Sequence, residues 1–253
     1  MTIAATRKDI EIWTKVITFD VDAPFDVPDL PTIDPFVIAS IFPALEVGGT
    51  MRVHGRVTRT LIRNILDFQS AWHCAAPKKC RLFDVQVEAV EDIAIAQEGP
   101  EANAIVAFSG GVDATLAFCR NISGDAGPAS FNVGATLLIQ GVPIGRRGKA
   151  SEPVIADLRR MSEAWGRPMA VVDTDIVDVI RKGDMSHGTW LAACLMLFGG
   201  RYDVGIIGST KTWFSRGWEV FGSHPLLDRL LSSGLMSIRN DEGLYHRAEK
   251  VAL

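Results

Sequence analysis

The chain has 253 residues, 47% of them hydrophobic and 22% charged, and this composition excludes an intrinsically disordered or low-complexity protein. A formal net charge of -4 argues against a nucleic-acid partner held by bulk electrostatic attraction. The four cysteines form no C-x-x-C pair, and the first segment has no secretory pattern, which predicts a cytoplasmic protein with reduced thiols. The apolar runs are too short to cross a bilayer, so we expect no membrane partner.

The first hundred residues predict a small α+β domain, residues 1–100, because strand-like and helix-like patterns both occur there. In chain order these patterns are a strand over 10–21, a partly helical segment over 36–49 that Pro43 limits, a short strand over 50–55, a helix over 57–72 and a strand over 81–96. The polar segment 97–103 contains Gly and Pro, which discourage the continuation of a helix or a strand. It therefore predicts the boundary of this domain.

From residue 104 onwards, short apolar runs alternate with amphipathic segments. The predicted strands and helices follow one another over 104–108, 113–122, 134–144, 151–166, 168–176, 188–200 and 202–210. Alternation at this spacing predicts an α/β domain, residues 104–253, with a parallel sheet and helices on both faces. The residues after 221 break the alternation, and we expect this tail to pack beside the strand ends and to bind an acceptor substrate.

The stretch AIVAFSGGVDATLAF, residues 104–118, interrupts an apolar run with a pair of glycines. A loop between a buried strand and the next helix lies at the carboxyl edge of a sheet, where α/β folds bind ligands. There the amides of Gly110 and Gly111 can face a phosphate at the start of a helix, and Ser109 and Thr115 add hydroxyl donors. Asp113 suits either Mg²⁺ bound to the phosphates or a contact that braces the loop. A plain turn with a helix cap is the alternative interpretation.

Two commoner phosphate-binding motifs are excluded by spacing. G-x-G-x-x-G does not follow this strand, and G-x-x-x-x-G-K-[ST] occurs nowhere in the chain. The residues SGGVDAT do resemble the SGGxDS signature of the PP-loop superfamily, the ATP pyrophosphatases or adenine nucleotide alpha hydrolase-like proteins. The resemblance spans residues 104–215, and the loop is its only specific motif. It implies a PP-loop, HUP-type fold and an ATP-dependent reaction.

In that superfamily ATP is cut between its α and β phosphates, AMP is transferred to a carbonyl or carboxylate oxygen, and a nitrogen or sulfur nucleophile then displaces AMP. The residues that this resemblance assigns to pyrophosphate and Mg²⁺ are Ser109, Gly110, Gly111, Asp113 and Thr115. Asp113 is the implied metal ligand and a catalytic candidate. Ala114 stands where the superfamily usually has Ser or Thr.

The same resemblance suggests candidates outside the loop. Ile139 and Gly141, at the end of the second strand of this domain, would line an adenine pocket, although any buried strand presents the same pattern. Lys211 in GIIGSTKTW would neutralise charge in the adenylation transition state, and a solvated loop lysine is the alternative. The candidates for contact with the acceptor substrate are His187, Glu219, His224 and Arg247. For each of these four an ordinary structural role is the alternative.

The expected function is therefore an ATP-dependent, AMP- and pyrophosphate-forming ligase that adenylates a small molecule for attack by nitrogen, with ATP and Mg²⁺ as cofactors. Because the chain has no recognisable glutaminase domain, the nitrogen would come from an amine, ammonia or a separate partner. Sulfur transfer to tRNA or a small molecule through Cys74 and Cys80 is one alternative, since two lysines between them would lower a thiol pKa. A non-catalytic nucleotide-binding protein, favoured by Ala114, is another. We also expect a homo-oligomer.

Overall fold

The computed structural model of the chain describes residues 1–7, 10–93, 103–141, 150–180, 183–210, 212, 221–241 and 243–252. Its central feature is a six-stranded sheet in the order β10-β9-β6-β7-β8-β3, parallel except for β3, which pairs antiparallel with β8 at one edge. The strands are β3 Phe19–Asp22, β6 Asn103–Ala107, β7 Asn132–Gln140, β8 Met169–Thr174, β9 Val204–Gly208 and β10 Ser237–Asp241. This arrangement confirms a mixed α/β fold with a mainly parallel sheet.

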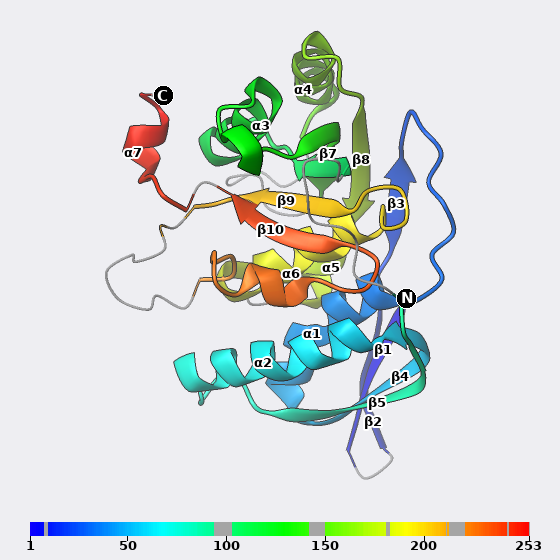
Figure 1. The fold of residues 1–253 in the computed structure, drawn as a ribbon. Coiled ribbons are helices and arrows are strands. Elements are labelled where there is room, and N and C mark those ends of the chain that lie inside the picture. Colours follow the sequence, from blue (N-terminus) through cyan, green and yellow to red (C-terminus); the bar gives the residue numbers. More distant parts are fainter. Residues whose placement is uncertain are drawn as a thin grey trace.

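Helices cover both faces of the sheet (Figure 1). α3 (Val112–Ser123) and α4 (Glu152–Ala164) lie on one face, and α6 (Gly183–Met196) lies on the other. Strand β7 shows why the sequence folds this way: Leu138 packs in the cluster beneath α3 and α4, whereas its neighbours Leu137 and Ile139 pack in the cluster on the α6 side. A parallel strand that is covered on both faces carries a continuous apolar run of this kind.

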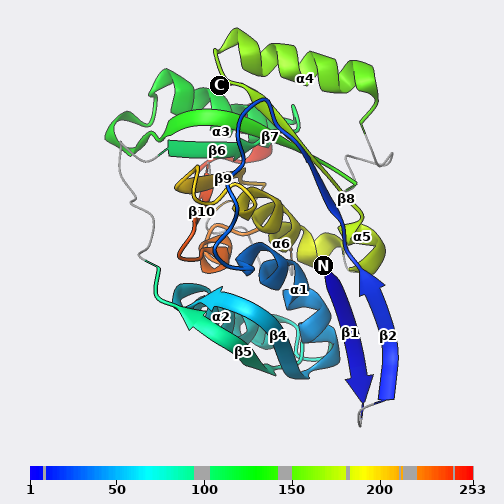
Figure 2. The same ribbon diagram turned by 90° about the vertical axis from the view of Figure 1, so that its right-hand side faces the viewer.

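A further layer packs outside α6 (Figure 2). Its elements are α1 Asp34–Val47, β4 Gly49–Thr58, α2 Arg59–Ala75 and β5 Phe83–Glu91, with β4 and β5 paired in parallel through α2. The rings of Phe42, Phe68 and Trp72 pack together between α1 and α2. They belong to the same buried cluster as Leu137 and Ile139 of the central sheet. The division into two domains stays a prediction, and residues 94–102 at the expected boundary lie outside the described residues.

The expected strand over 10–21 is in fact two strands in different sheets. β2 (Ile10–Val16) pairs only with β1 (Thr2–Arg7) in an antiparallel hairpin, which projects beyond α1 in Figure 2, and the chain then continues into β3. The division falls at Ile17, whose side chain is fully buried and whose N–H donates to the Met1 carbonyl over 2.8 Å. Beyond Ile17 the chain changes partner, from β1 to β8.

Two other expectations about local structure are corrected. α1 continues through Pro43, although the sequence predicts that Pro43 limits the helix. A proline inside a helix costs about 3 kcal/mol or more, and here the helix is buried along most of its length, which offsets that cost. The tail after residue 221 does more than pack beside the strand ends, because β10 joins the sheet as its outermost parallel strand.

The remaining elements are short: the 3-10 turns η1 Gly127–Ala129 and η2 Asp228–Leu231, and the helices α5 Ile176–Val179 and α7 Arg247–Lys250. Within the described ranges, every helix is too short or too polar to cross a bilayer.

Candidate functional site

The strand order changes direction between β6 and β9. From β6 the chain moves to β7 and β8 on one side, and then crosses to β9 and β10 on the other. In open α/β sheets, ligands bind in the crevice outside the carboxyl ends of the strands at the point where the order reverses. The segments that follow β6 and β9 lie at this edge. Residues 109–115, Ser209, Arg247 and Lys250 meet there, and we call them the candidate site.

The loop between β6 and α3 turns tightly at Gly110. Gly110 has a φ of 71°, and an added Cβ would lie 2.5 Å from Cδ2 of Leu158 on α4. Gly111 is the N-cap residue of α3, and its N–H donates to Oγ of Ser109 over 3.4 Å; among the described residues no side chain accepts a capping hydrogen bond from the helix. The first helical amides, of residues 112–114, therefore have neither an intrahelical acceptor nor a side-chain cap. Such amides at a helix N-terminus favour an anion.

Gly208 allows the end of β9 to approach the start of α3 very closely. A Cβ added at Gly208 would lie 2.4 Å from the carbonyl oxygen of Asp113 and 2.8 Å from the amide nitrogen of Ala114. Both are backbone atoms, which cannot turn aside as a flexible side chain can. The absence of a side chain at residue 208 therefore sets the separation between the two segments that flank the crevice.

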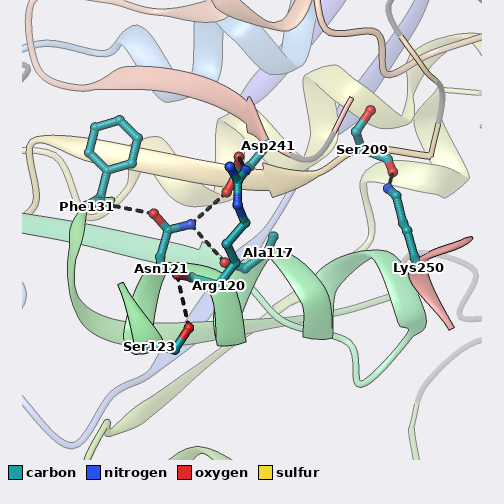
Figure 3. A network of polar contacts seen from close by, with 8 residues as sticks. All are labelled: Ala117, Arg120, Asn121, Ser123, Phe131, Ser209, Asp241 and Lys250. Atoms are coloured by element: carbon teal, nitrogen blue, oxygen red, sulfur yellow. Dashed lines mark hydrogen bonds and ion pairs between the residues drawn. The ribbon is translucent and has the colours of Figure 1, made fainter. Parts of the chain in front are cut away.

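Asp113 pairs with two cations from α7. Nζ of Lys250 lies 3.1 Å from Oδ1 of Asp113 and also donates to the carbonyl oxygen of Ser209, toward which its side chain points in Figure 3. Nε of Arg247 lies 3.8 Å from Oδ2 of Asp113. The side chain of Lys250 is fully buried and that of Asp113 is 14% exposed, whereas Arg247 is largely exposed. The bracing contact expected of Asp113 is thus present, and its role as a metal ligand stays a prediction.

A second group of contacts fixes the end of β10 to α3 (Figure 3). The side-chain amide of Asn121 donates to Oδ2 of Asp241 over 2.6 Å, and Arg120 lies 3.6 Å from the other carboxylate oxygen. The N–H of Ser209 donates to the backbone carbonyl of Asp241 over 2.7 Å. These contacts join the ends of β9 and β10 to α3. They hold Ser209 in place, so that its own carbonyl oxygen can accept from Lys250.

His187 and His224, both predicted to contact the acceptor, lie near the same glycine. The ring of His187 in α6 packs edge-on against Phe221 with 4.6 Å between ring centroids. A Cβ added at Gly222 would lie 2.6 Å from Nδ1 of His187. His224 follows two residues later, and its Nδ1 accepts from the N–H of Leu226 over 3.1 Å. The fold thus packs the segment that contains His224 against the start of α6, which contains His187, 37 positions earlier in the chain.

A buried carboxylate holds this segment. Asp228 is fully buried and accepts hydrogen bonds from the hydroxyl of Ser223 (2.6 Å), the side-chain amide of Asn240 (2.6 Å) and the N–H of His224 (3.0 Å). Desolvation by burial raises the pKa of Asp228 from 3.8 to about 6, and the three hydrogen bonds partly oppose this shift. In the sequence Asp228 is one of many polar residues in the tail that could contact an acceptor, and a lone aspartate in an apolar stretch gives no spacing signal that distinguishes it.

This raised pKa predicts a pH-dependent contribution to stability. Folded Asp228 keeps its proton up to about pH 6, whereas the unfolded chain releases it near 3.8, so the folded state binds more protons in between. The stabilisation is present below pH 3.8 and is lost as pH rises through about 6. Relative to Asp228→Asn, which cannot titrate, the free energy of unfolding of the wild type should therefore fall by up to about 3 kcal/mol over this range. Urea unfolding of both proteins at each pH tests this, and a difference that stays constant or rises would contradict it.

The predicted adenine-pocket residues lie at the carboxyl end of β7. Ile139 is only 5% exposed and packs on the α6 side of the sheet. Gly141 has a φ of 80°, and an added Cβ would lie 1.7 Å from the carbonyl oxygen of Thr174, so only glycine fits there. Between them, the buried Oε1 of Gln140 has no hydrogen-bond partner among the described residues. A polar acceptor is therefore available at this strand end.

Ala114 lies on the face of α3 that is turned to the core. It is 9% exposed and packs in the same cluster as Phe108 and Phe118. The hydroxyl of a serine or threonine at this position would enter an apolar cluster, where burial of a polar group is unfavourable. Alanine therefore suits the packing of α3 on the sheet.

The four cysteines differ in their burial. Cys74 is exposed and Cys80 is buried, at the end of α2 and beyond it, in the layer outside α6. Burial raises the thiol pKa of both Cys119 and Cys194, which disfavours the reactive thiolate. The described residues also contain no group of three or more His, Cys, Asp or Glu able to hold a metal ion.

Two predicted residues, Lys211 and Glu219, lie outside the described residues. Of the others, the fold brings Ser109, Gly110, Gly111, Asp113, Thr115 and Arg247 to one edge of the sheet. Lys250, which contacts Asp113, was one of many charged residues in the tail, and no spacing rule connects residues 113 and 250.

Comparison with known proteins gives no independent assignment. No protein-family model, no curated protein and no solved structure matches this chain.

Proposed function

We propose that the chain is an ATP-dependent ligase of the PP-loop type that forms AMP and pyrophosphate. The observation that carries this proposal is the placement of SGGVDAT at the carboxyl edge of the sheet, where the strand order reverses and the first amides of α3 are uncapped. In this proposal the phosphates lie against the amides of Gly110 and Gly111 and the hydroxyls of Ser109 and Thr115. The adenine lies at the end of β7, beside Ile139 and Gly141.

The residues present suit Mg²⁺ that arrives with the nucleotide. Mg²⁺ is commonly bound by one or two carboxylates together with substrate phosphates, and Asp113 supplies one carboxylate at the loop. Oδ1 of Asp113 contacts Lys250, the ion pair of its Oδ2 with Arg247 is longer, at 3.8 Å, and this carboxylate would hold the metal. When bound, the metal would neutralise phosphate charge.

The proposed reaction has two steps. An oxygen of the acceptor carboxylate attacks the α-phosphorus, the bond from this phosphorus to the bridging oxygen breaks, and pyrophosphate leaves with the bonding electrons. The nitrogen of an amine or ammonia then attacks the acyl carbon, AMP leaves, and the nitrogen loses a proton. We assign proton acceptance to His187 or His224 and acceptor binding to Arg247, whose side chain is 65% exposed at the edge. Lys211 and Glu219 keep their proposed roles as catalytic cation and acceptor contact.

A product assay tests the reaction. The purified chain is incubated with ATP labelled on the α-phosphate, Mg²⁺ and panels of carboxylates and amines. AMP and pyrophosphate that appear only with both co-substrates would support the ligase. ADP and phosphate would contradict it, and binding without turnover would favour the non-catalytic alternative. Loss of activity in both Cys74→Ser and Cys80→Ser would favour sulfur transfer instead.

The variant Asp113→Asn tests the assignment of the metal ligand. We expect its turnover to fall by at least about 100-fold, because several kcal/mol of charge stabilisation through the metal would be removed. Asp157→Asn is the matched control, since Asp157 on α4 is 61% exposed and pairs only with neighbouring Arg160 among the described contacts. Turnover of Asp113→Asn at the wild-type rate would show that Asp113 does not serve the metal.

A further inference from the structure

One buried ammonium joins the two segments that flank the crevice. Nζ of Lys250 contacts the carboxylate of Asp113, in the first turn of α3, and the carbonyl of Ser209, directly after β9. These segments come from the two sides of the reversal in strand order. The Lys250 side chain is 0% exposed, so water does not solvate its charge. Removal of an ammonium from water is unfavourable by several kcal/mol, and both contacts are needed to offset it.

The charges at this point matter for any phosphate ligand. Asp113 lies in the first turn of α3, next to the uncapped amides, and its side chain is only 14% exposed. Water therefore screens its negative charge poorly, and without a neighbouring cation this charge would repel a nearby polyphosphate. Lys250 neutralises this charge, and Arg247 at 3.8 Å adds a second positive charge. The three residues together carry a formal charge of one positive unit, which attracts an anion.

α7 is built so that Lys250 reaches this position. His246 begins the helix with a capping box: its N–H donates to the Glu249 side chain over 2.6 Å, and its own side chain accepts from the Glu249 backbone. This pair of hydrogen bonds stabilises a helix of a single turn. Arg247 and Lys250 are three positions apart and thus share one face of the turn, the face toward Asp113.

We propose that Lys250 is a positioning residue of the nucleotide site: by neutralising Asp113 and holding Ser209, it allows a nucleoside triphosphate to approach the loop at 109–115. This inference rests on the proposed function. To the proposed function the inference adds a specific element, the helical turn HRAEK at 246–250, and a mechanism in which Lys250 acts through Asp113. The role does not require Lys250 to touch the ligand.

A double-mutant cycle tests this mechanism. ATP binding in the presence of Mg²⁺ is measured by calorimetry for the wild type, Lys250→Gln, Asp113→Asn and the double variant. Glutamine keeps a hydrogen-bond donor but removes the charge. We expect Lys250→Gln to weaken ATP binding by about 10- to 100-fold when Asp113 is present, because this poorly solvated carboxylate is left beside the phosphates with only the longer contact to Arg247. In the Asp113→Asn background, where no carboxylate remains, the same change should weaken binding by less than about threefold.

Two control variants show whether the effect on ATP binding comes from the charge of Lys250 itself. Lys250→Arg keeps the positive charge, and its affinity should stay within about threefold of the wild type. Lys15→Met removes one positive charge from the exposed hairpin strand β2 and should leave binding unchanged. An equal loss from Lys250→Gln in both backgrounds, no loss in either, or a loss in Lys250→Arg as large as in Lys250→Gln would overturn the inference. If the wild type itself does not bind ATP, the proposed function fails and this inference fails with it.

Discussion

Replacement of Gly208 by alanine is expected to lower the affinity for ATP by at least about tenfold and to reduce the free energy of unfolding by about 1–3 kcal/mol, because it overpacks a backbone contact. The added Cβ would lie 2.4 Å from the carbonyl oxygen and 2.6 Å from the carbonyl carbon of Asp113. Real Cβ atoms do not approach backbone that closely, so β9 and the start of α3 must separate. This separation would displace the uncapped amides and the carboxylate of Asp113 at once.

Gly124→Ala is the matched control for this prediction. Gly124 ends the same helix, α3, and has a φ of 75° with no atom within 4 Å of an added Cβ. Alanine there is strained by its backbone conformation alone, and we expect a loss of about 1 kcal/mol in stability with ATP affinity unchanged. Calorimetry and urea unfolding on both variants separate the local effect from general destabilisation. Equal ATP affinity in Gly208→Ala and the wild type would show that the crevice does not bind the nucleotide.

Thr58→Val is expected to reduce the free energy of unfolding by about 3–5 kcal/mol, the largest stability effect that we predict. The hydroxyl of Thr58 donates to the carboxylate of Asp34 over 2.6 Å and accepts from the N–H of Leu61 and of Gly234. Valine keeps the shape of the side chain but can neither donate nor accept these hydrogen bonds. Asp34, which is fully buried and whose pKa is raised by desolvation, would lose a hydrogen bond that favours its charged form.

The structural consequence of Thr58→Val extends beyond its own helix. Through Gly234, Thr58 connects the layer of α1 and α2 to the segment that leads into β10. Thr50→Val, at an exposed position of the same strand β4, is the control and should change stability by less than about 0.5 kcal/mol. Urea unfolding measures both variants. A loss in Thr58→Val no larger than in the control would show that this hydroxyl does not stabilise the fold.

The sequence predicts local elements best where one physical signal is strong. The apolar run at 104–108, the glycine pair and the helix after it were all expected, and the structure has β6, the turn at Gly110 and α3 there. α2 likewise follows from helical spacing of apolar residues. β3 was expected only as the end of a longer strand, and β10 was not expected, because each joins the sheet at an edge, where pairing with a distant strand decides the conformation of a short segment.

The candidate site was predicted only in part, for a related reason. The loop residues 109–115 are contiguous, so one stretch of sequence is enough to identify them. Lys250 is 137 positions from Asp113, and its side chain matters only because α7 folds against α3. Asp228 likewise acquires its raised pKa from burial, and burial depends on how η2 packs beneath β10.

By itself, the sequence determined that a strand, a glycine turn and a helix follow one another at 104–118, because backbone freedom and apolar runs act over a few neighbouring residues. It also determined an alternating α/β pattern. Only the tertiary structure decided that this turn meets β9 across the reversal in strand order, that Gly208 sets their separation, and that Asp113 pairs with Lys250. These contacts join residues far apart in the chain, and their energies depend on burial and distance, which exist only once the chain has folded.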